Sequence, residues 1–330
     1  MSQITEIKQH IAILQHLVHQ KVMNLDLPEH PNRLYEPISY FMSIGGKRLR
    51  PVLALLAAEL FGKEAATAMP SALAVELFHN FTLLHDDIMD KAPLRRGKQT
   101  VHEKYDANVA ILSGDALMVL AYQQLLPADA TQLPALLHEI NKVALEVCEG
   151  QQYDMDFQDR ERVTTEEYMR MIKLKTSVLL GAAMKMGAIQ AGAHAADQQR
   201  AYDFGLYTGL AFQVQDDLLD VFGDPEKFGK KPGGDILANK NTYLRVKAME
   251  IADQTTRVAL NSWYAAPDSE AKVLEVTHLF RSLGIREMAE GEMQALLQRA
   301  FAALDGIESA NEHAKAKLKA FAEYLIAREE

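Results

Sequence analysis

Two aspartate-rich segments with the spacing Asp-Asp-x-x-Asp carry the strongest chemical signal in the chain. They run from Asp86 to Asp90 and from Asp216 to Asp220. On an α-helix the first and last aspartates of each segment share one face, where like charges cost roughly 0.2–0.5 kcal/mol per pair. Mg²⁺ prefers oxygen ligands and is usually held by one or two carboxylates together with substrate phosphates. The spacing therefore predicts a phosphate site built through magnesium.

The residues before each cluster separate this prediction from a simpler one. An acidic run is often only a solvated helix face. The stretches 72–84 and 209–215 are, however, mostly apolar and should be largely buried. An aspartate cluster at the end of a buried stretch favours a binding site over a solvated helix face.

Positive charge gathers beside glycines at three places. The patches are Gly45-Gly46-Lys47-Arg48-Leu49-Arg50-Pro51, Arg95-Arg96-Gly97-Lys98 and Gly229-Lys230-Lys231-Pro232-Gly233-Gly234-Asp235. Glycine lets the backbone approach a ligand closely, and Lys and Arg donate to phosphate. Two of the patches follow an aspartate cluster, which indicates diphosphate binding.

Composition excludes several classes of protein. The 330 residues are 48% hydrophobic and 24% charged, which is typical of a soluble globular protein, and the net charge of −10 disfavours a nucleic-acid partner. Cys148 is the only cysteine, so no intramolecular disulfide and no multi-cysteine zinc site is possible, and a reducing cytoplasm fits. The amino terminus lacks a secretory pattern, and no apolar run is long enough for a membrane span.

The hydrophobic period is helical almost everywhere, which predicts an all-α fold. The segment from Thr164 to Glu167 has the spacing of a capping box, and no linker divides the chain, so we expect a single domain over 1–330. Irregular segments are expected at 91–99 and 223–241, directly after the clusters. The expected helices are about 3–23, 32–44, 52–62, 70–91, 107–125, 134–158, 165–191, 197–222, 242–265, 269–282, 284–304 and 309–328.

From about Tyr35 to Ala248 the chain resembles the trans-isoprenyl diphosphate synthases, also called polyprenyl synthetases. Besides the clusters and the basic patches, the matching pieces are Glu76-Leu77-Phe78-His79, Gly150-Gln151-Gln152-Tyr153-Asp154, Lys175-Thr176 and Phe212-Gln213-Val214-Gln215. The resemblance implies a helical bundle of the isoprenoid synthase type around a central cavity, usually in a homodimer. It also implies the reaction, in which isopentenyl diphosphate is joined to dimethylallyl, geranyl or farnesyl diphosphate and pyrophosphate leaves.

The resemblance also implies roles for the clusters. Three Mg²⁺ ions would bridge the allylic diphosphate to Asp86, Asp90 and Asp216, while Asp87, Asp217 and Asp220 would act directly or through metal-bound water. The metal would neutralise the leaving group as its C–O bond ionises. The cations expected to hold that group are Arg95, Lys175, Lys230 and Lys240.

The second substrate has its own residues in the family. Isopentenyl diphosphate is expected at Lys47, Arg50, His79 and Arg96. A lone helical histidine is more often a core residue, but the motif around His79 favours diphosphate binding. Thr176 and Gln213 match positions that stabilise the allylic carbocation. No side-chain general base is apparent, and in the family the pyrophosphate is thought to remove the last proton.

Product length is expected to depend on bulk beneath the first cluster. Phe81 and Phe78 lie five and eight residues before Asp86, about 7.5 and 12 Å along a helix axis. In the family, an aromatic at the fifth position points to short products, commonly C20, and a second one at the fourth would favour C15. Thr82 occupies the fourth position, so we expect C20 over C15. The alternative is that Phe81 only packs the core.

Some positions depart from the family pattern: Gln99 stands where proline is frequent, and Asn239-Lys240-Asn241-Thr242-Tyr243 replaces the more familiar Gly-Lys-x-Thr-Leu. Two other functions also stay open. A class I terpene cyclase shares the fold and the first cluster, but usually has a different second metal motif. A non-catalytic subunit of a heteromeric synthase tends to lose one cluster, and this chain keeps both.

Overall fold

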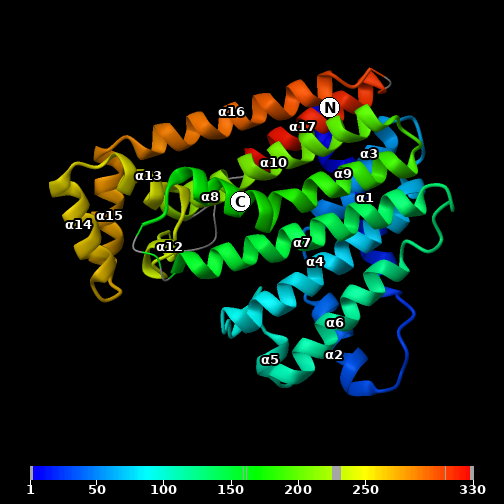
Figure 1. Ribbon diagram of the computed structural model, residues 1–330, viewed down its shortest axis with the longest axis horizontal. Helices are drawn as coiled ribbons and strands as arrows, with labels where there is room; N and C mark the ends of the chain where they lie inside the picture. The colour runs from blue at the N-terminus through cyan, green and yellow to red at the C-terminus, as the bar shows by residue number, and fades with distance from the viewer. Residues whose placement is uncertain (1–2, 159, 161, 225–231, 309, 328–330) are drawn as a thin grey trace. The chain divides into compact units, whose positions relative to one another are not determined.

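A computed structural model describes residues 3–158, 160, 162–224, 232–308 and 310–327. Regular structure in these residues is helical apart from one two-stranded hairpin, β1 (Leu94–Arg95) and β2 (Lys98–Gln99), which confirms the all-α prediction (Figure 1). No described helix is long and apolar enough to cross a membrane. The α-helices are α1 (Gln3–Met23), α2 (Asn32–Ser43), α3 (Leu49–Leu60), α4 (Met69–Met89), α5 (Val101–Lys104), α6 (Ala107–Gln123), α7 (Leu133–Gln158), α8 (Thr165–Ile172), α9 (Val178–Gln190), α10 (Ala195–Phe222), α12 (Gly234–Leu237), α13 (Tyr243–Ile251), α14 (Gln254–Ala265), α15 (Glu270–Ser282), α16 (Ile285–Asp305) and α17 (Glu312–Ile326).

Most predicted helices are present, and the differences have local causes. Thr164 and Glu167 form the predicted capping box at the start of α8. The helix expected over 165–191 is interrupted by η2 (Lys173–Ser177), a π-helical segment. The single helix expected over 242–265 is wrong, because the carboxylate of Asp253 accepts from the backbone N–H of Thr256 and starts α14 separately from α13.

The chain divides into two compact units. The first contains Met1–Asn141, Ala182–Tyr202 and Ile307–Leu318, and the second contains Lys142–Gly181, Asp203–Gly306 and Lys319–Glu330. The expectation of a single domain over 1–330 stays a prediction.

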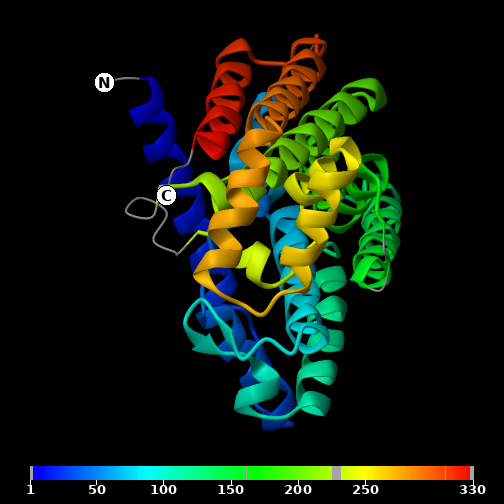
Figure 2. The ribbon, with the colours of Figure 1, turned by 90° about the vertical axis from the view of Figure 1, so that its left-hand side faces the viewer.

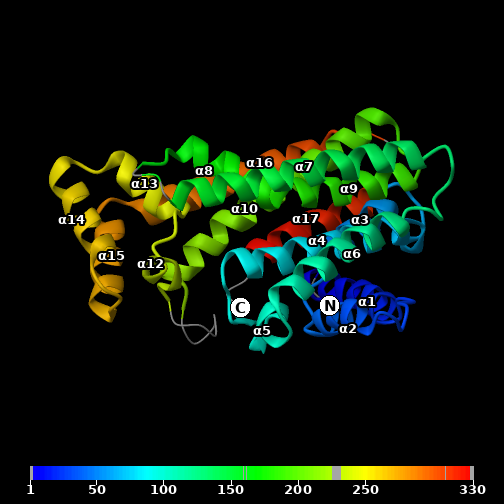
Figure 3. The same ribbon diagram turned by 60° about the horizontal axis from the view of Figure 1, so that its bottom comes forward.

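In the first unit, α4 packs against α3 and α6, and α4 and α6 run side by side in Figures 1 and 3. Every residue from Val52 to Ala58 in α3 is buried. The first-unit part of α9 packs tightly on α3, since a Cβ added at Gly187 would lie 2.2 Å from the carbonyl oxygen of Ala54. Figure 2 shows the β1–β2 hairpin, in teal, after α4. This unit carries the first aspartate cluster.

In the second unit, α13 contacts α8, α15 and α16, and α12 contacts α15. Figure 3 shows α12 beside α15 at the end of α10. Within the second unit α9 and α10 come close at Gly205, where an added Cβ would lie 2.5 Å from the carbonyl oxygen of Leu180. This unit carries the second aspartate cluster and the Lys175 and Lys240 segments.

Candidate active site

Both aspartate clusters lie at the carboxyl ends of their helices. Asp86 is in the last turn of α4 and Asp90 is its C-cap, while Asp216 and Asp220 lie in the last two turns of α10. The helix macrodipole is negative at this end, so an exposed carboxylate there costs about 0.3–1 kcal/mol. Neither helix has a basic residue in its last turn. Each cluster therefore needs positive charge from another element or from a ligand.

Arg95, on β1, supplies part of that charge to the first cluster. Its Nε lies 2.9 Å from both carboxylate oxygens of Asp87, and its NH2 lies 2.8 Å from Asp87 Oδ1. The same nitrogen is 3.9 Å from Asp86 Oδ2. Asp87 is only 3% exposed, whereas the side chain of Asp86 is 22% exposed and Asp90 is exposed. Asp86 and Asp90 are thus the members of this cluster that a ligand can reach.

The turn of the β1–β2 hairpin brings a second arginine, Arg96, against Gly46, in the loop that precedes α3. Arg96 and Gly97 have φ values of 53° and 74°, as expected for the two central residues of a type I′ turn. A Cβ added at Gly46 would lie 2.7 Å from NH1 of Arg96. Glycine at 46 therefore lets the Arg96 guanidinium pack against the backbone beside Lys47.

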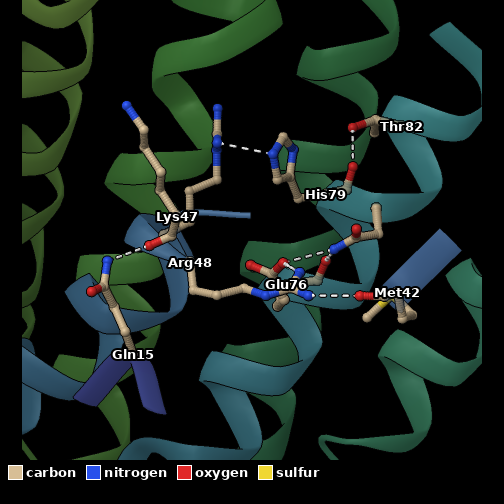
Figure 4. Close-up of polar contacts among 9 residues, drawn as sticks. Gln15, Met42, Lys47, Arg48, Glu76, His79 and Thr82 are labelled. Atoms are coloured by element: carbon tan, nitrogen blue, oxygen red, sulfur yellow. Dashed lines mark hydrogen bonds and ion pairs between the residues drawn. The ribbon is translucent and has the colours of Figure 1, made fainter. Parts of the chain in front are cut away.

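His79 lies among the arginines of this unit. Its Nε2 is 3.0 Å from NH1 of Arg50 (Figure 4). Burial lowers the pKa of His79 well below 6.5, and Arg50, Arg95, Arg96 and Arg48 lower it further. The ring is therefore neutral, and its Nε2 accepts the Arg50 hydrogen bond. Burial also lowers the pKa of Arg96, helped by Arg95 and Arg48 and opposed by Glu76 and Asp87. The four arginines around His79 outnumber these two acids, so positive charge is in excess here. Such a cluster is suited to an anion.

A buried ion pair supports this cluster. Arg48 is 5% exposed and has a φ of 48°, and its NH1 donates to Oε1 of Glu76, which is 3% exposed. Its NH2 donates to the Met42 carbonyl at 3.1 Å, and Asn80 Nδ2 donates to Glu76 Oε1 at 2.7 Å. Sequence reasoning gave these residues no supporting role, although an acid such as Glu76 within an apolar run was the available signal.

Lys47 is held through its backbone. The amide of Gln15, on α1, donates to the Lys47 carbonyl at 2.5 Å. Figure 4 shows the Lys47 side chain pointing away from the buried Arg48–Glu76 pair. The four predicted isopentenyl diphosphate ligands therefore all lie in the first unit, with Arg50 bonded to His79 and Arg96 against the loop that carries Lys47.

In the second cluster Asp217 is buried, like Asp87 in the first. It is 4% exposed and accepts hydrogen bonds from the Tyr168 hydroxyl at 2.6 Å and from the Tyr243 N–H at 2.8 Å. Burial raises its pKa to about 7, against the effect of the two hydrogen bonds, and Asp235 and Asp216 raise it further. Tyr168 was not identified from the sequence, because no local spacing connects it to α10.

Asp220 holds Gly233 and Asp235, at the start of α12. Its Oδ2 accepts from the Asp235 N–H at 2.9 Å, and its carbonyl accepts from the Gly233 N–H at 2.5 Å. Lys240 Nζ lies 2.9 Å from Asp235 Oδ1. The predicted ligand Lys230 lies outside the described residues.

Lys175 and Thr176 lie in the π-helical segment η2. A short π segment inside a helix often marks a functional site because it redirects side chains. Lys175 Nζ lies 2.5 Å from Asp154 Oδ2 on α7. A Cβ added at Gly150 on α7 would lie 2.1 Å from the backbone N of Lys175, so only glycine lets the two helices approach here. Gln213, on α10, is partly exposed.

Three rings form a row on α4 below the first cluster. The centroids of Phe78 and Phe81 are 5.5 Å apart, and those of Phe81 and His85 are 4.8 Å apart. Phe78 is fully buried, while Phe81 is partly exposed. Thr82 donates to the His79 carbonyl at 2.8 Å. The aromatic bulk predicted beneath Asp86 is therefore present, with His85 as a member that sequence reasoning missed.

The donor set fits Mg²⁺ only in combination with a phosphate. Among the described residues, no three His, Cys, Asp or Glu side chains converge closely enough to hold a metal by themselves. The accessible carboxylates are hard oxygen donors at the carboxyl ends of helices whose own last turns hold no basic residue. Mg²⁺ is commonly held by one or two such carboxylates, with water and substrate phosphate completing the shell.

Comparisons with known proteins agree with this chemistry. Residues 31–282 match the family model described as polyprenyl synthetase. A geranylgeranyl pyrophosphate synthase from Geoglobus acetivorans is 40% identical over 71% of this chain and 74% of its own length. A short chain isoprenyl diphosphate synthase from Methanothermobacter thermautotrophicus is 37% identical over 91% of each chain. The crystal structure of a geranylgeranyl pyrophosphate synthase has a TM-score of 0.88 and 42% identity, covering 99% of both chains.

Proposed function

This chain belongs to the polyprenyl synthetase family, and from that premise we propose the reaction and the residues that carry it out. The protein is a trans-prenyltransferase. It condenses isopentenyl diphosphate with dimethylallyl, geranyl or farnesyl diphosphate, releases pyrophosphate, and favours a C20 product over C15. The observation that carries the proposal best is the group of arginines around neutral His79, within the unit that also presents Asp86 and Asp90.

The arginine group is proposed to bind isopentenyl diphosphate. Lys47, Arg50 and Arg96 supply the positive charge. His79 is neutral, so it fixes the Arg50 guanidinium without adding to the repulsion among the cations. Bidentate arginine donors suit a diphosphate.

The allylic diphosphate is proposed to bind with magnesium at the aspartate clusters. Asp86 and Asp90 are accessible in the first cluster, and Asp216 is their counterpart in the second, so these three are proposed as direct ligands. Bound Mg²⁺ would act as a Lewis acid on the leaving diphosphate. Three ions per site remain the number we propose.

Asp87 and Asp217 are proposed to position their clusters. Both carboxylate oxygens of Asp87 accept hydrogen bonds from Arg95. Asp217 accepts from the Tyr168 hydroxyl and the Tyr243 N–H. Arg95, oriented in this way, can donate its remaining N–H groups to the diphosphate.

Lys175 and Lys240 are proposed to bind the same leaving group by exchanging a carboxylate partner for phosphate. Their present partners are Asp154 and Asp235. Thr176, beside Lys175, and Gln213 are proposed to stabilise the carbocation through their oxygen dipoles. Because the carbocation reacts with water, these polar groups must be few and fixed.

We also propose a homodimer and a cytoplasmic location. The dimer is supported by α6, where Ile111, Leu112 and Val119 are 42%, 59% and 55% exposed. These three positions fall within about 100° of one another around the helix, so they form one apolar stripe. The location is supported by the single cysteine, which needs no oxidising compartment.

The direct test is a product assay on the purified protein. It is incubated with isopentenyl diphosphate, each of the three allylic diphosphates and Mg²⁺, with and without a chelator, and products are resolved by chain length. We expect prenyl diphosphates ending mainly at C20, and none with chelator. A hydrocarbon product would indicate a terpene cyclase, and no turnover without a partner would indicate a subunit.

Substitutions in the first aspartate cluster test the proposed metal site. Asp86→Asn and Asp90→Asn should each lower kcat by about 100-fold or more, because each removes a proposed ligand of the metal that assists ionisation. Asp305→Asn, at an exposed site on α16, is the matched control and should stay at wild-type activity. Wild-type kcat in both cluster variants would contradict the proposed metal site.

A further inference from the structure

Lys272, on α15, is a fully buried lysine in the second unit. Its exposed fraction is 0%, and its ammonium has three acceptors: Asn239 Oδ1 at 2.9 Å, the Ala266 carbonyl at 3.3 Å and Asp268 Oδ1 at 3.4 Å. The side chain of Asp268 is itself 68% exposed. Burying an ammonium is costly, and an apolar side chain of similar size would often be as stable or more so. Stability alone therefore does not explain a lysine here.

The shortest of these bonds goes to a residue in an unusual conformation. Asn239 has a φ of 53°, in the left-handed region that glycine adopts at least cost. Asparagine tolerates this conformation, but its advantage over glycine is the side chain. That side chain accepts from Lys272 and so ties the turn to α15.

The residue that follows Asn239 is Lys240, and other contacts hold the same short segment. Arg245, on α13, donates to the Asn239 carbonyl and, at 3.5 Å, to the Lys240 carbonyl. On the other side, Asn241 Nδ2 donates to the Phe157 carbonyl on α7 at 2.8 Å. Lys240 is therefore flanked by two asparagines that anchor the backbone to different helices.

The side chain of Lys240 is linked to the second cluster through Asp235. Its Nζ lies 2.9 Å from Asp235, whose N–H donates to Asp220 at 2.9 Å. Lys240 is 64% exposed at its side chain, so a ligand can reach it. Because a lysine has four rotatable bonds, its reach depends on where the backbone holds its Cα.

We propose that Lys272, through its hydrogen bond to Asn239, is a positioning residue that holds Lys240 where it binds the diphosphate of the allylic substrate. The proposal rests on the function proposed above for Lys240. It adds a specific role for two residues that do not touch the substrate.

The test compares two variants, each with a control, in the full-length protein. Lys272→Met and Asn239→Gly should each raise KM for the allylic diphosphate about three- to tenfold, the loss expected for one such hydrogen bond. KM for isopentenyl diphosphate should not change, because its proposed ligands lie in the first unit. Asn239→Asp keeps an acceptor for Lys272 and should stay within about twofold of wild type.

A purely local account makes the opposite prediction for Asn239→Gly. Glycine relieves a positive φ, so without a role for the side chain this variant should be as active as wild type, or more so. Lys315→Met is the control for replacing a buried lysine. Lys315 is 7% exposed, pairs with Glu312 at 2.8 Å and lies in the first unit, so both KM values should be unchanged.

A double-mutant comparison separates the two proposals. Lys240→Gln alone should raise KM for the allylic diphosphate, and adding Lys272→Met should change it by less than about twofold. If Lys240→Gln is impaired but Lys272→Met and Asn239→Gly are not, the positioning role is wrong and the function of Lys240 stands. If Lys240→Gln behaves as wild type, both are wrong. If Lys272→Met does not fold, Asn239→Gly decides the question, because it changes only a turn residue.

Discussion

The second aspartate of each cluster differs in its surroundings from the first and the third. Asp87 and Asp217 are 3% and 4% exposed and are satisfied by protein donors. Asp86 and Asp90 are more accessible, as are Asp216 and Asp220. One motif therefore contains two kinds of carboxylate, one kind that fixes neighbouring elements and one that can meet a ligand.

His79 should make the stability of the protein depend on pH. Its pKa is far below 6.5 in the folded protein and near 6.5 in the unfolded chain, so below pH 6.5 the unfolded chain binds more protons. The free energy of unfolding should therefore fall as the pH is lowered from 7 to 5, by at most about 1.4 kcal/mol per pH unit from this group. Urea unfolding of wild type and His79→Gln checks this. The difference in free energy of unfolding between the two proteins should shrink toward low pH. Parallel curves of unfolding free energy against pH would contradict the role of His79.

Phe81 is expected to limit product length. The ring is partly exposed and is held between Phe78 and His85. Phe81→Ala removes this bulk about one and a half turns below Asp86, so products should extend beyond C20. Chain-length analysis after complete turnover is the measurement, with Phe280→Leu in the second unit as a control that keeps the wild-type distribution. An unchanged distribution in Phe81→Ala would mean that another residue sets the limit.

At the scale of elements, helix ends and close helix approaches place the chemistry. Both clusters lie where the helix dipole disfavours acid, which leaves them dependent on cations from elsewhere. Lys175 lies in the π segment η2, and Gly150 lets α7 pack directly against this segment. The geometry of Lys175 thus depends on the absence of a side chain on another helix.

Two glycine variants test this dependence. Gly150→Ala puts a Cβ 2.1 Å from the Lys175 backbone, so α7 and η2 must separate, at a cost of about 1–3 kcal/mol and with a lower kcat. Gly291→Ala, on α16, meets nothing within 4 Å. It should stabilise the protein by up to about 1 kcal/mol through helix propensity and leave kcat unchanged. Thermal unfolding and steady-state kinetics on both variants provide the comparison. Equal changes in stability and kcat in the two variants would mean that the close approach of α7 to η2 is unimportant.

At the scale of the whole molecule, charge and apolar surface are distributed unevenly. The net charge is −10, yet four arginines gather around one histidine in the first unit. An anionic substrate is thus attracted to a local positive field rather than to the protein as a whole. The exposed stripe on α6 is a different kind of surface, and we propose that a second copy of the chain covers it.

The stripe makes a testable prediction about assembly. Leu112→Glu combined with Val119→Glu should convert a dimer into a monomer, because charge would replace the apolar surface to be buried. Light scattering after size exclusion gives the mass. Leu274→Glu, at a 70% exposed position on α15, is the matched control and should leave the mass unchanged. A wild-type protein that is already monomeric would contradict the assignment.

The sequence by itself determined the family, the all-α fold, the reaction class and most helix ends, since these follow from local spacing. Asp86 and Asp90 share a helix face because of their separation alone, and the Thr164 capping box needs only four residues. Tertiary structure decided which side chains meet across long separations. Tyr168 reaches Asp217 over 49 residues and Lys272 reaches Asn239 over 33. Such contacts depend on how distant helices pack, and no local period encodes that packing.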